Sequence, residues 1–250
     1  MITVENLRKR YDGNPILDGL SFTVKDGEIY GLLGPNGSGK STTMKILSGI
    51  LKPDEGNVII EGVNASENQL KVKEIVGFVP ESPTLYESLT PAELFDFIGK
   101  VRKIPRGLLE ERVNAFVKAF GIEEYLDQFI GTLSFGTKQK VSIIAALLHD
   151  PKVLVLDEAM NGLDVKSARI FRELLLEYKR KGKSIVFSTH VLQLAEIICD
   201  RIGVIHRGRI VAEGTVEELK KRLEEKSLED VFLKITESRE EVLEIVKALK

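Results

Sequence analysis

The chain has 250 residues, 43% of them hydrophobic, which is enough to form the core of one large α/β domain or two small ones. Its 36 basic and 38 acidic residues nearly balance, so charge gives no case for a nucleic-acid partner. A lone cysteine, Cys199, excludes an intramolecular disulfide, and we expect it to be a small buried apolar residue. No signal peptide and no apolar run long enough to span a bilayer is found. We therefore expect a cytosolic protein that meets a membrane only through a partner.

The first sixty residues alternate apolar and polar side chains, as half-buried strands do. The runs ITV, LSFTV, EIYGLL and NVIIEG are separated by Asp-Gly turn signals at 12–13 and 26–27. Two later runs, VLVLD and SIVFST, are apolar without alternation, which favours parallel strands buried on both faces. Between them, Phe171, Leu175 and Tyr178 recur at helical spacing, so we predict a βαβ crossover.

The region from about 81 to 149 is predicted to be a helical insertion in this α/β domain. In the sequence TPAE, Thr90 can cap a helix, Pro91 suits the first helical position and Glu93 closes a capping box. The helical pattern then continues to about Leu148.

The C-terminal region begins with RIGVIHRGRIVAEG, which predicts a hairpin with Arg-Gly at its turn. Three further capping boxes are predicted to start at Thr215, Ser227 and Ser238. We expect one domain over residues 1–236, followed by a helix over 237–250.

The stretch GPNGSGKST follows the strand EIYGLL and opens the helix KSTTMKILSGI, which is the context that a G-x-x-x-x-G-K-[ST] phosphate loop requires. Its glycines allow backbone N–H groups to turn toward phosphate oxygens, and the helix N-terminus adds a partial positive charge. The lysine adds a full charge, and the first hydroxyl residue after it is a candidate ligand of Mg²⁺. The nucleotide-binding residues are predicted to be Gly34, Pro35, Asn36, Gly37, Ser38, Gly39, Lys40, Ser41 and Thr42.

Two carboxylates follow the buried strand VLVL at its carboxyl end, where open parallel sheets bind ligands. Asp157 is placed to hold Mg²⁺ through water, and Glu158 is placed to polarise a water for attack on a γ-phosphate. Alone, the pair would be interpreted as the polar end of a strand. After a phosphate loop, it favours phosphoryl transfer.

A second helix start, LSFGTKQK, has Ser134 as its cap and Gly136 open to approach, so it too would attract an anion. With GPNGSGKST, VLVLDEA, NGLD and STH in this order, the chain resembles the ATP-binding subunit of ABC transporters from Tyr11 to about Thr236. The resemblance implies that two subunits stack head to tail. The phosphate loop of one would hold Mg-ATP, and Ser134 and Gly136 of the other would cover its γ-phosphate.

The resemblance also implies roles for single residues. Tyr11 would stack on adenine, with a surface tyrosine at a strand end as the alternative. Asp164 in NGLD would shape the contact between subunits, and it can also cap the helix that follows. His190 in FSTHVL would contact the γ-phosphate and orient the attacking water, with a polar strand end as the alternative.

The chain departs from the family pattern in two places. Glu81 stands where most members have a glutamine that contacts Mg²⁺, and its charge would strengthen metal binding or raise a carboxyl pKa. Glutamate here, together with SLEDVFLKIT at 227–236, resembles the branch that pairs with ABC-2-type export permeases. In the signature, Phe135 and Thr137 replace a glycine and a glutamine, while Gln139 is kept. We expect the capping of the neighbour's ATP to survive, with a weaker or asymmetric site as the alternative.

These observations predict an α/β protein: a P-loop NTPase core with a parallel sheet, an N-terminal antiparallel β lobe and an inserted α-helical subdomain. The resemblance implies an ATPase that forms a homo- or heterodimer around two Mg-ATP and powers an integral-membrane permease, an exporter by branch, on the cytoplasmic face of the cell membrane. Residues 81–97 would dock on the permease. Apolar candidates for that surface, some of which could belong to the core, are Leu85, Tyr86, Leu89 and Leu94.

Two other functions remain open. One is a non-transport ABC ATPase of the translation or DNA-repair type, and the other is a low-turnover half of a heterodimer. The first usually fuses two ATPase units or inserts long coiled coils, which this chain lacks, and the presence of both Glu158 and His190 argues against the second. A small GTPase is disfavoured because the guanine-reading sequence NKxD is absent.

Overall fold

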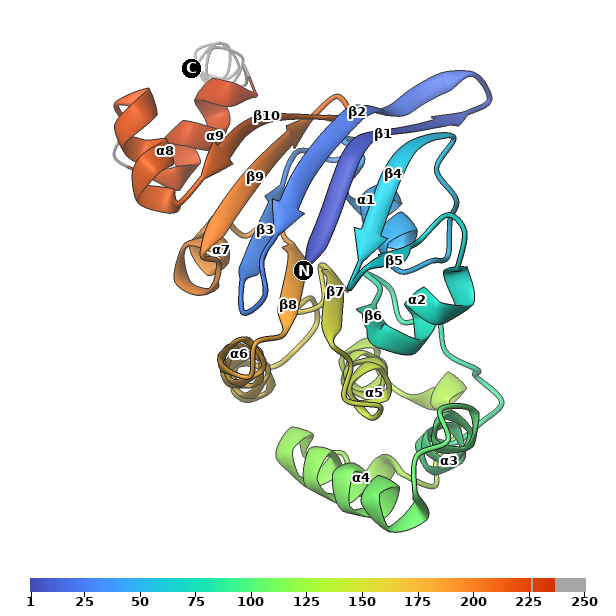
Figure 1. The fold of residues 1–250 in the computed structure, drawn as a ribbon. Coiled ribbons are helices and arrows are strands. Elements are labelled where there is room, and N and C mark those ends of the chain that lie inside the picture. The colour runs from blue at the N-terminus through green and yellow to red at the C-terminus, as the bar shows by residue number, and fades with distance from the viewer. Residues whose placement is uncertain (226, 237–250) are drawn as a thin grey trace.

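The computed structural model describes residues 1–225 and 227–236, which form two β-sheets with helices between and around them (Figure 1). The helix predicted over 237–250, with its capping box at Ser238, lies outside the described residues. Within the described part of the chain, no helix combines the length and the apolar character needed to cross a bilayer.

The first sheet is antiparallel and corresponds to the predicted N-terminal lobe. Its strands, in spatial order, are β2 (Asn14–Val24), β1 (Ile2–Tyr11), β4 (Glu55–Ile60) and β5 (Val63–Asn64). Alternation explains its burial: Ile2, Val4 and Val58 face the core, while Thr3 and Ile59 are only half-buried.

The second sheet is mainly parallel and carries the candidate site. Its strands, in spatial order, are β10 (Arg209–Gly214), β9 (Arg201–His206), β3 (Ile29–Leu33), β8 (Ser184–Ser188), β7 (Val153–Asp157) and β6 (Val76–Val79). Every residue of β7 and β8 is buried, as their continuous apolar runs predict. Every residue of β3 is buried too, although its run was grouped with the alternating strands, because β3 lies inside the sheet between β8 and β9. The predicted βαβ unit is confirmed, because β7 and β8 pair in parallel and helix α6 (Val165–Arg180) connects them.

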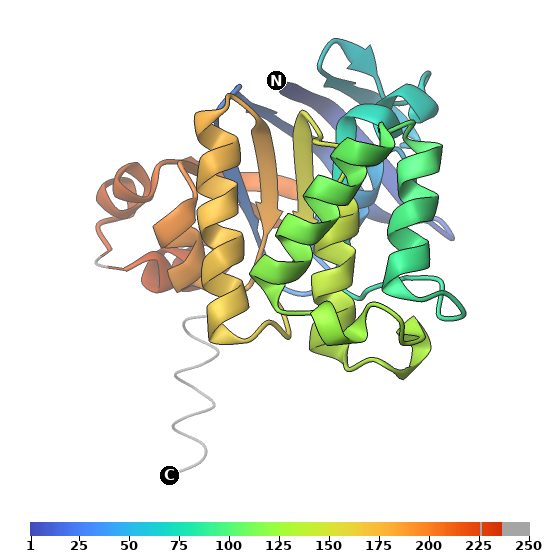
Figure 2. The ribbon, with the colours of Figure 1, turned by 90° about the horizontal axis from the view of Figure 1, so that it is seen from below.

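Helices pack on both faces of the second sheet. Helix α1 (Lys40–Leu47) contributes to the core shared with the first sheet, through Met44 and Ile46. On the other side, helices α4 (Arg106–Phe120) and α5 (Phe135–Leu147) lie between α6 and α3 (Pro91–Val101) (Figure 2).

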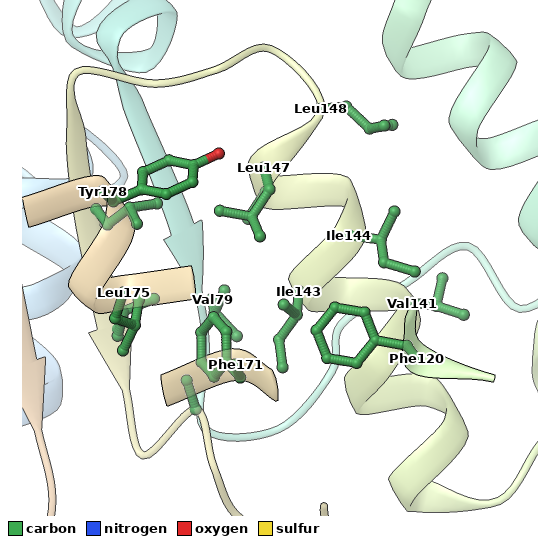
Figure 3. Close-up of a cluster of buried hydrophobic side chains, with 14 of the residues drawn as sticks. Val79, Phe120, Val141, Ile143, Ile144, Leu147, Leu148, Phe171, Leu175 and Tyr178 are labelled. Carbon is green, nitrogen blue, oxygen red and sulfur yellow. The ribbon is translucent and has the colours of Figure 1, made fainter. Parts of the chain in front are cut away.

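The first helix of the insertion starts at Pro91, as its predicted capping box requires, and the insertion belongs to the same hydrophobic core. Thr90 Oγ1 accepts from Glu93 N at 3.2 Å, and Glu93 Oε2 accepts from Thr90 N at 2.9 Å, which is a complete capping box. Phe120 of α4 packs in one cluster with side chains of α5 and α6 (Figure 3). The insertion also contains two 3₁₀ turns, η1 (Glu123–Tyr125) and η2 (Ile130–Thr132). Helix α2 (Gln69–Ile75) comes before it in the chain and leads directly into β6.

The C-terminal region confirms the predicted hairpin of β9 and β10. Helices α7 (Leu192–Ile198), α8 (Val216–Leu223) and α9 (Leu228–Ile235) lie around the edge that it forms (Figure 1). Thr215 forms its predicted capping box with Glu218.

The capping box predicted at Ser227 is only half correct. Ser227 Oγ does accept from Asp230 N at 3.0 Å, so it caps α9. The Asp230 carboxylate, however, accepts from the Ser227 hydroxyl at 2.6 Å. An aspartate has a shorter side chain than the glutamate of a capping box, and here it bonds to the cap's hydroxyl.

Cys199 is partly buried, and its thiol packs against the backbone of Gly31, where an added Cβ would lie 2.8 Å from Sγ. Burial raises the pKa of the Cys199 thiol. The predicted role as a small apolar residue therefore fits its surroundings.

Candidate functional site

The loop 34–39 connects the buried strand β3 to helix α1 and is shaped by its glycines. An added Cβ at Gly34 would lie 2.4 Å from Ile205 O, and one at Gly39 would lie 2.6 Å from Leu17 Cδ2. Gly37 has open space around it, but its φ of 78° is a left-handed conformation that favours glycine. Packing therefore requires glycine at position 34, and backbone conformation requires it at position 37 and also at position 39, where φ is 108°.

Lys40, the first residue of α1, folds back over this loop and is buried. Its ammonium Nζ donates to Gly34 O at 2.6 Å and to Pro35 O at 3.1 Å. Burial lowers the pKa of Lys40, and the nearby carboxylates of Glu158, Asp157 and Glu81 oppose that shift. A buried cation that rests on two carbonyl oxygens gains strongly from an incoming phosphate.

Asp157 is the last residue of β7, and it is paired in register with Ser188 at the end of β8. Ser188 Oγ donates to Asp157 Oδ1 at 2.7 Å, and it accepts from Glu158 N at 3.1 Å. Glu158 itself has a φ of 49°. A non-glycine residue in this conformation is strained, and such strain is commonly found at active sites and ligand-binding sites.

Glu158 and His190 lie close together at the mouth of the site. His190 Nδ1 is 2.9 Å from Glu158 Oε2, and the two side chains are 61% and 8% exposed. The two atoms are within ion-pair distance, but their angles do not make a hydrogen bond, and Oε2 has no hydrogen-bond partner among the described residues. The nearly buried oxygen is thus free to accept a hydrogen bond from a bound water.

A polar cavity of about 500 Å³ brings most of the predicted residues together. It is lined by Asn36, Gly37, Gly39, Lys40, Ser41, Thr42, Glu81, Glu158 and His190. Eight predicted residues do not line it. Four of them, Gly34, Pro35, Ser38 and Asp157, belong to the loop or to the strand end beside the cavity, and the other four are Tyr11, Ser134, Gly136 and Asp164.

The donor set of the cavity fits a magnesium ion that binds together with a phosphate. No group of three His, Cys, Asp or Glu side chains that could hold a metal is found in the part of the chain that the structure describes. Mg²⁺ usually binds through one or two carboxylates, waters and the phosphates of a substrate. The hydroxyl of Ser41 and the carboxylates of Glu81 and Asp157, close to Lys40, suit that mode.

The second helix start is the N-terminus of α5, and it is open to solvent. Ser134 caps α5 by accepting from Thr137 N at 3.2 Å, and both Ser134 and Phe135 are exposed. An added Cβ at Gly136 would lie 2.5 Å from Gly162 O, so this helix start touches the loop that follows Glu158. The α5 N-terminus faces outward from the molecule.

Gln139 links helix α5 to the segment that follows strand β7. Its side chain is fully buried, and its Nε2 donates to Ala159 O at 2.9 Å. Ala159 comes directly after Glu158 in the chain. The sequence alone does not predict this contact, because Gln139 and Ala159 are 20 residues apart in the chain.

Asp164 caps helix α6, which was one of its two predicted roles. Its carboxylate accepts from Ser167 N at 2.9 Å and from Ser167 Oγ at 2.8 Å. It also pairs with Lys140 Nζ of α5 at 2.7 Å. These donors lower the pKa of Asp164, with the Lys140 contact as the largest cause.

Tyr11 ends strand β1 and is 45% exposed. Its ring contacts Lys9, whose Nζ lies 5.9 Å from the ring centroid. The remaining ring surface is available to a planar ligand.

The sequence is similar to known ATP-binding proteins of transporters. Residues 17–161 match the family described as ABC transporter. The chain is 36% identical over 223 residues to the linearmycin resistance ATP-binding protein LnrL of Bacillus subtilis, covering 89% of this chain and 72% of that protein. It is 35% identical to the Nod factor export ATP-binding protein I of Ralstonia nicotianae, covering 88% of this chain and 68% of that protein.

Solved structures agree with these relatives. The ATP-binding subunit of an ABC transporter has a TM-score of 0.90 and 32% identity, covering 94% of this chain and 99% of that one. A dimeric ATP-binding cassette in a post-hydrolysis state, bound to ADP and phosphate, has a TM-score of 0.79 and 26% identity, covering 86% and 98%. Together with the cavity at the phosphate loop, these matches show that the chain belongs to the ABC transporter family, as one of its ATP-binding and ATP-hydrolysing subunits.

Proposed function

We propose that this chain binds Mg-ATP in the cavity at loop 34–42 and hydrolyses it as one half of a head-to-tail dimer that drives an integral-membrane permease. The observation that carries the proposal is the contact of His190 with Glu158, 2.9 Å apart, at the mouth of a cavity that also contains Lys40. A phosphate held on Lys40 would present its terminal group to these two side chains.

Each residue of the cavity has a chemical task in this proposal. Backbone N–H groups of the loop and the ammonium of Lys40 bind the phosphates. Glu158 Oε2 accepts the proton of the attacking water, and His190 orients that water and the γ-phosphate. Mg²⁺, held by Ser41, Asp157 and Glu81, would neutralise negative charge on the phosphates. Tyr11 would stack on the adenine ring.

The dimer follows from the second helix start. Ser134 and the N–H groups near Gly136 lie outside the chain's own cavity and face solvent. Donors at an exposed helix N-terminus suit the γ-phosphate of a neighbouring subunit. The dimeric relative described above supports this arrangement, in which two copies, or this chain and a paralogue, enclose two nucleotides.

The permease contact is proposed at residues 81–97. Tyr86 and Phe97 are 62% and 47% exposed, and their rings meet edge to face with centroids 6.1 Å apart. Leu85 and Leu89 are half-buried, whereas Leu94 is 4% exposed and belongs to the core. The docking surface therefore consists of the aromatic pair and its neighbours, without Leu94. Relatives named for resistance and export support an exporter that works from the cytoplasmic face of the membrane.

The test of the site is the variant Glu158→Gln, with Glu217→Gln as its control because Glu217 is an exposed glutamate on α8. Loss of a general base costs about 10²- to 10⁴-fold in rate, so we expect the hydrolysis rate of Glu158→Gln to fall by that factor while ATP still binds. We also expect this variant to become a dimer with Mg-ATP in light scattering. Hydrolysis at the wild-type rate, or a monomer at saturating Mg-ATP, would contradict the proposal.

The permease contact is tested separately in the reconstituted transporter. Alanine at Tyr86 and Phe97 should lower transport per ATP hydrolysed, while the ATPase rate of the isolated subunit stays unchanged. Intact coupling in the double variant would refute the assigned docking surface.

A further inference from the structure

The short helix α7 follows His190 closely in the chain. It begins at Leu192, and its N-cap residue Val191 makes no side-chain capping hydrogen bond. A helix of seven residues has little stability of its own and takes its position from packing. What α7 packs against therefore bears on where His190 lies.

On the strand side, the segment that carries His190 is anchored near Asp157. Ser188 bonds to the Asp157 carboxylate at 2.7 Å, and Thr189 Oγ1 accepts from Val191 N at 3.0 Å. His190 lies between Thr189 and Val191, and its side chain is 61% exposed. Its position is thus determined by Ser188 on one side and by α7 on the other.

On the far side, α7 is held by the C-terminal helices through one carboxylate. Glu196 Oε1 of α7 pairs with Lys220 Nζ of α8 at 2.7 Å. The same oxygen accepts from Leu228 N at 3.2 Å, which is the first backbone N–H of α9. That N–H has no partner inside its helix, and a negative charge at a helix N-terminus is stabilising. The side chain of Glu196 is 31% exposed, so water screens these interactions only in part.

Apolar contacts support the same connection. One cluster contains the buried Ala195 of α7 together with the buried Leu219 of α8 and Leu228 of α9. Leu192 of α7, and Cys199 directly after α7, pack against this cluster. The three helices α7, α8 and α9 form one packed unit next to strand β9, separate from the nucleotide cavity.

We propose that Glu196 is a positioning residue: through its bonds to Lys220 and Leu228 N, the C-terminal helices α8 and α9 hold α7 and keep His190 against Glu158. The inference rests on the proposed role of His190. It gives the C-terminal helices a part in hydrolysis, although they contribute no residue to the cavity.

The test compares Glu196→Ala and Glu196→Gln with Glu229→Gln. Glu229 is an exposed carboxylate in the first turn of α9, so its variant removes a charge from the same helix end without touching α7. Displacement of a catalytic group by a distant change commonly lowers rates, and we expect kcat of Glu196→Ala to fall about tenfold with KM for ATP changed less than about twofold. Glu196→Gln keeps an acceptor for Leu228 N and should recover part of this loss. Glu229→Gln should match the wild type.

A second measurement separates positioning from general stability. In a His190→Ala background, Glu196→Ala should lower the residual kcat by less than about twofold, because its effect passes through a side chain that is already absent. A full tenfold loss in that background would overturn the inference, as would wild-type kcat in Glu196→Ala. If Glu158→Gln abolishes hydrolysis while Glu196→Ala does not affect it, only this inference fails and the proposed function stands.

Discussion

Ser188 Oγ donates a hydrogen bond to Asp157 Oδ1 at 2.7 Å, joining the ends of two neighbouring parallel strands. The same hydroxyl accepts from the backbone of Glu158 at 3.1 Å. The buried Ser188 thus orients the carboxylate of Asp157, the predicted Mg²⁺ ligand, and the backbone N–H of Glu158, the predicted general base.

Ser188→Ala should therefore weaken both stability and hydrolysis. It leaves a buried carboxylate without a donor, which costs about 1–3 kcal/mol in the free energy of unfolding. Ser184→Ala is the matched control, because Ser184 is buried at the other end of β8 and donates to the backbone oxygen of Lys25. Urea unfolding measures the loss of stability in each variant. ATPase assays should find a loss of activity only for Ser188→Ala. Equal ATPase rates in both variants would contradict the role of Ser188.

Gly136→Ala should disturb the outward-facing start of α5. The added Cβ would lie 2.5 Å from Gly162 O, so either the helix or the loop after Glu158 must move. Gly107→Ala is the control, because Gly107 occupies the same place in the first turn of α4 with nothing within 4 Å of its Cβ. Alanine is the better helix former by about 1 kcal/mol, so Gly107→Ala should not destabilise the fold.

The readout for Gly136→Ala is dimer formation with Mg-ATP in the Glu158→Gln background. We expect Gly136→Ala to remain largely monomeric, and Gly107→Ala to form the dimer as the parent does. A Gly136→Ala protein that forms the dimer normally would show that this helix start does not contribute to the subunit contact.

Asp164 has two predicted roles, of which the structure shows one, the N-cap of α6, and substitution can separate them. Asp164→Ala removes the N-cap of α6 and should cost about 1 kcal/mol of stability, whereas Asp164→Ser keeps a capping oxygen and should cost much less. If Asp164 also shapes the subunit contact, Asp164→Ser should regain stability without regaining ATPase activity. Thermal unfolding and ATPase rates measured on both variants decide this. Full activity in Asp164→Ser would leave Asp164 as a helix cap alone.

The lowered pKa of His149 predicts that the free energy of unfolding depends on pH. Burial lowers its pKa from 6.5 to about 4, with Arg102 adding to the shift. Because the folded-state pKa lies below the unfolded one, the neutral side chain favours folding above pH 6.5, and this contribution is lost as the pH falls toward 4. Allowing for partial exposure, the loss amounts to roughly 2 kcal/mol.

The measurement is urea unfolding of the wild type and His149→Gln between pH 7 and pH 4. Other groups titrate in this range in both proteins, so the difference between the two curves isolates His149. We expect the variant to lose less stability on acidification than the wild type. Parallel curves would show that His149 does not contribute.

Local chemistry explains what could be predicted from sequence. A phosphate loop is a contiguous run whose glycines, lysine and hydroxyls act through their own backbone and the adjoining helix, so its spacing alone identifies it. The capping box at Thr90 is likewise complete within four residues. The box predicted at Ser227 also spans four residues, but only its cap forms, because the Asp230 carboxylate bonds to the Ser227 hydroxyl.

The sequence by itself determined the class of protein and the phosphate loop, because the loop and the motifs that identify the family are short runs of neighbouring residues. Only the tertiary structure decided that Glu81, Glu158 and His190 line the same cavity as that loop. Tertiary structure alone decided that Ser188 orients Asp157, that Gln139 bonds to Ala159, and that Glu196 reaches Leu228 N. These partners are separated by 31, 20 and 32 residues, and only the packing of sheet and helices brings them within hydrogen-bond distance.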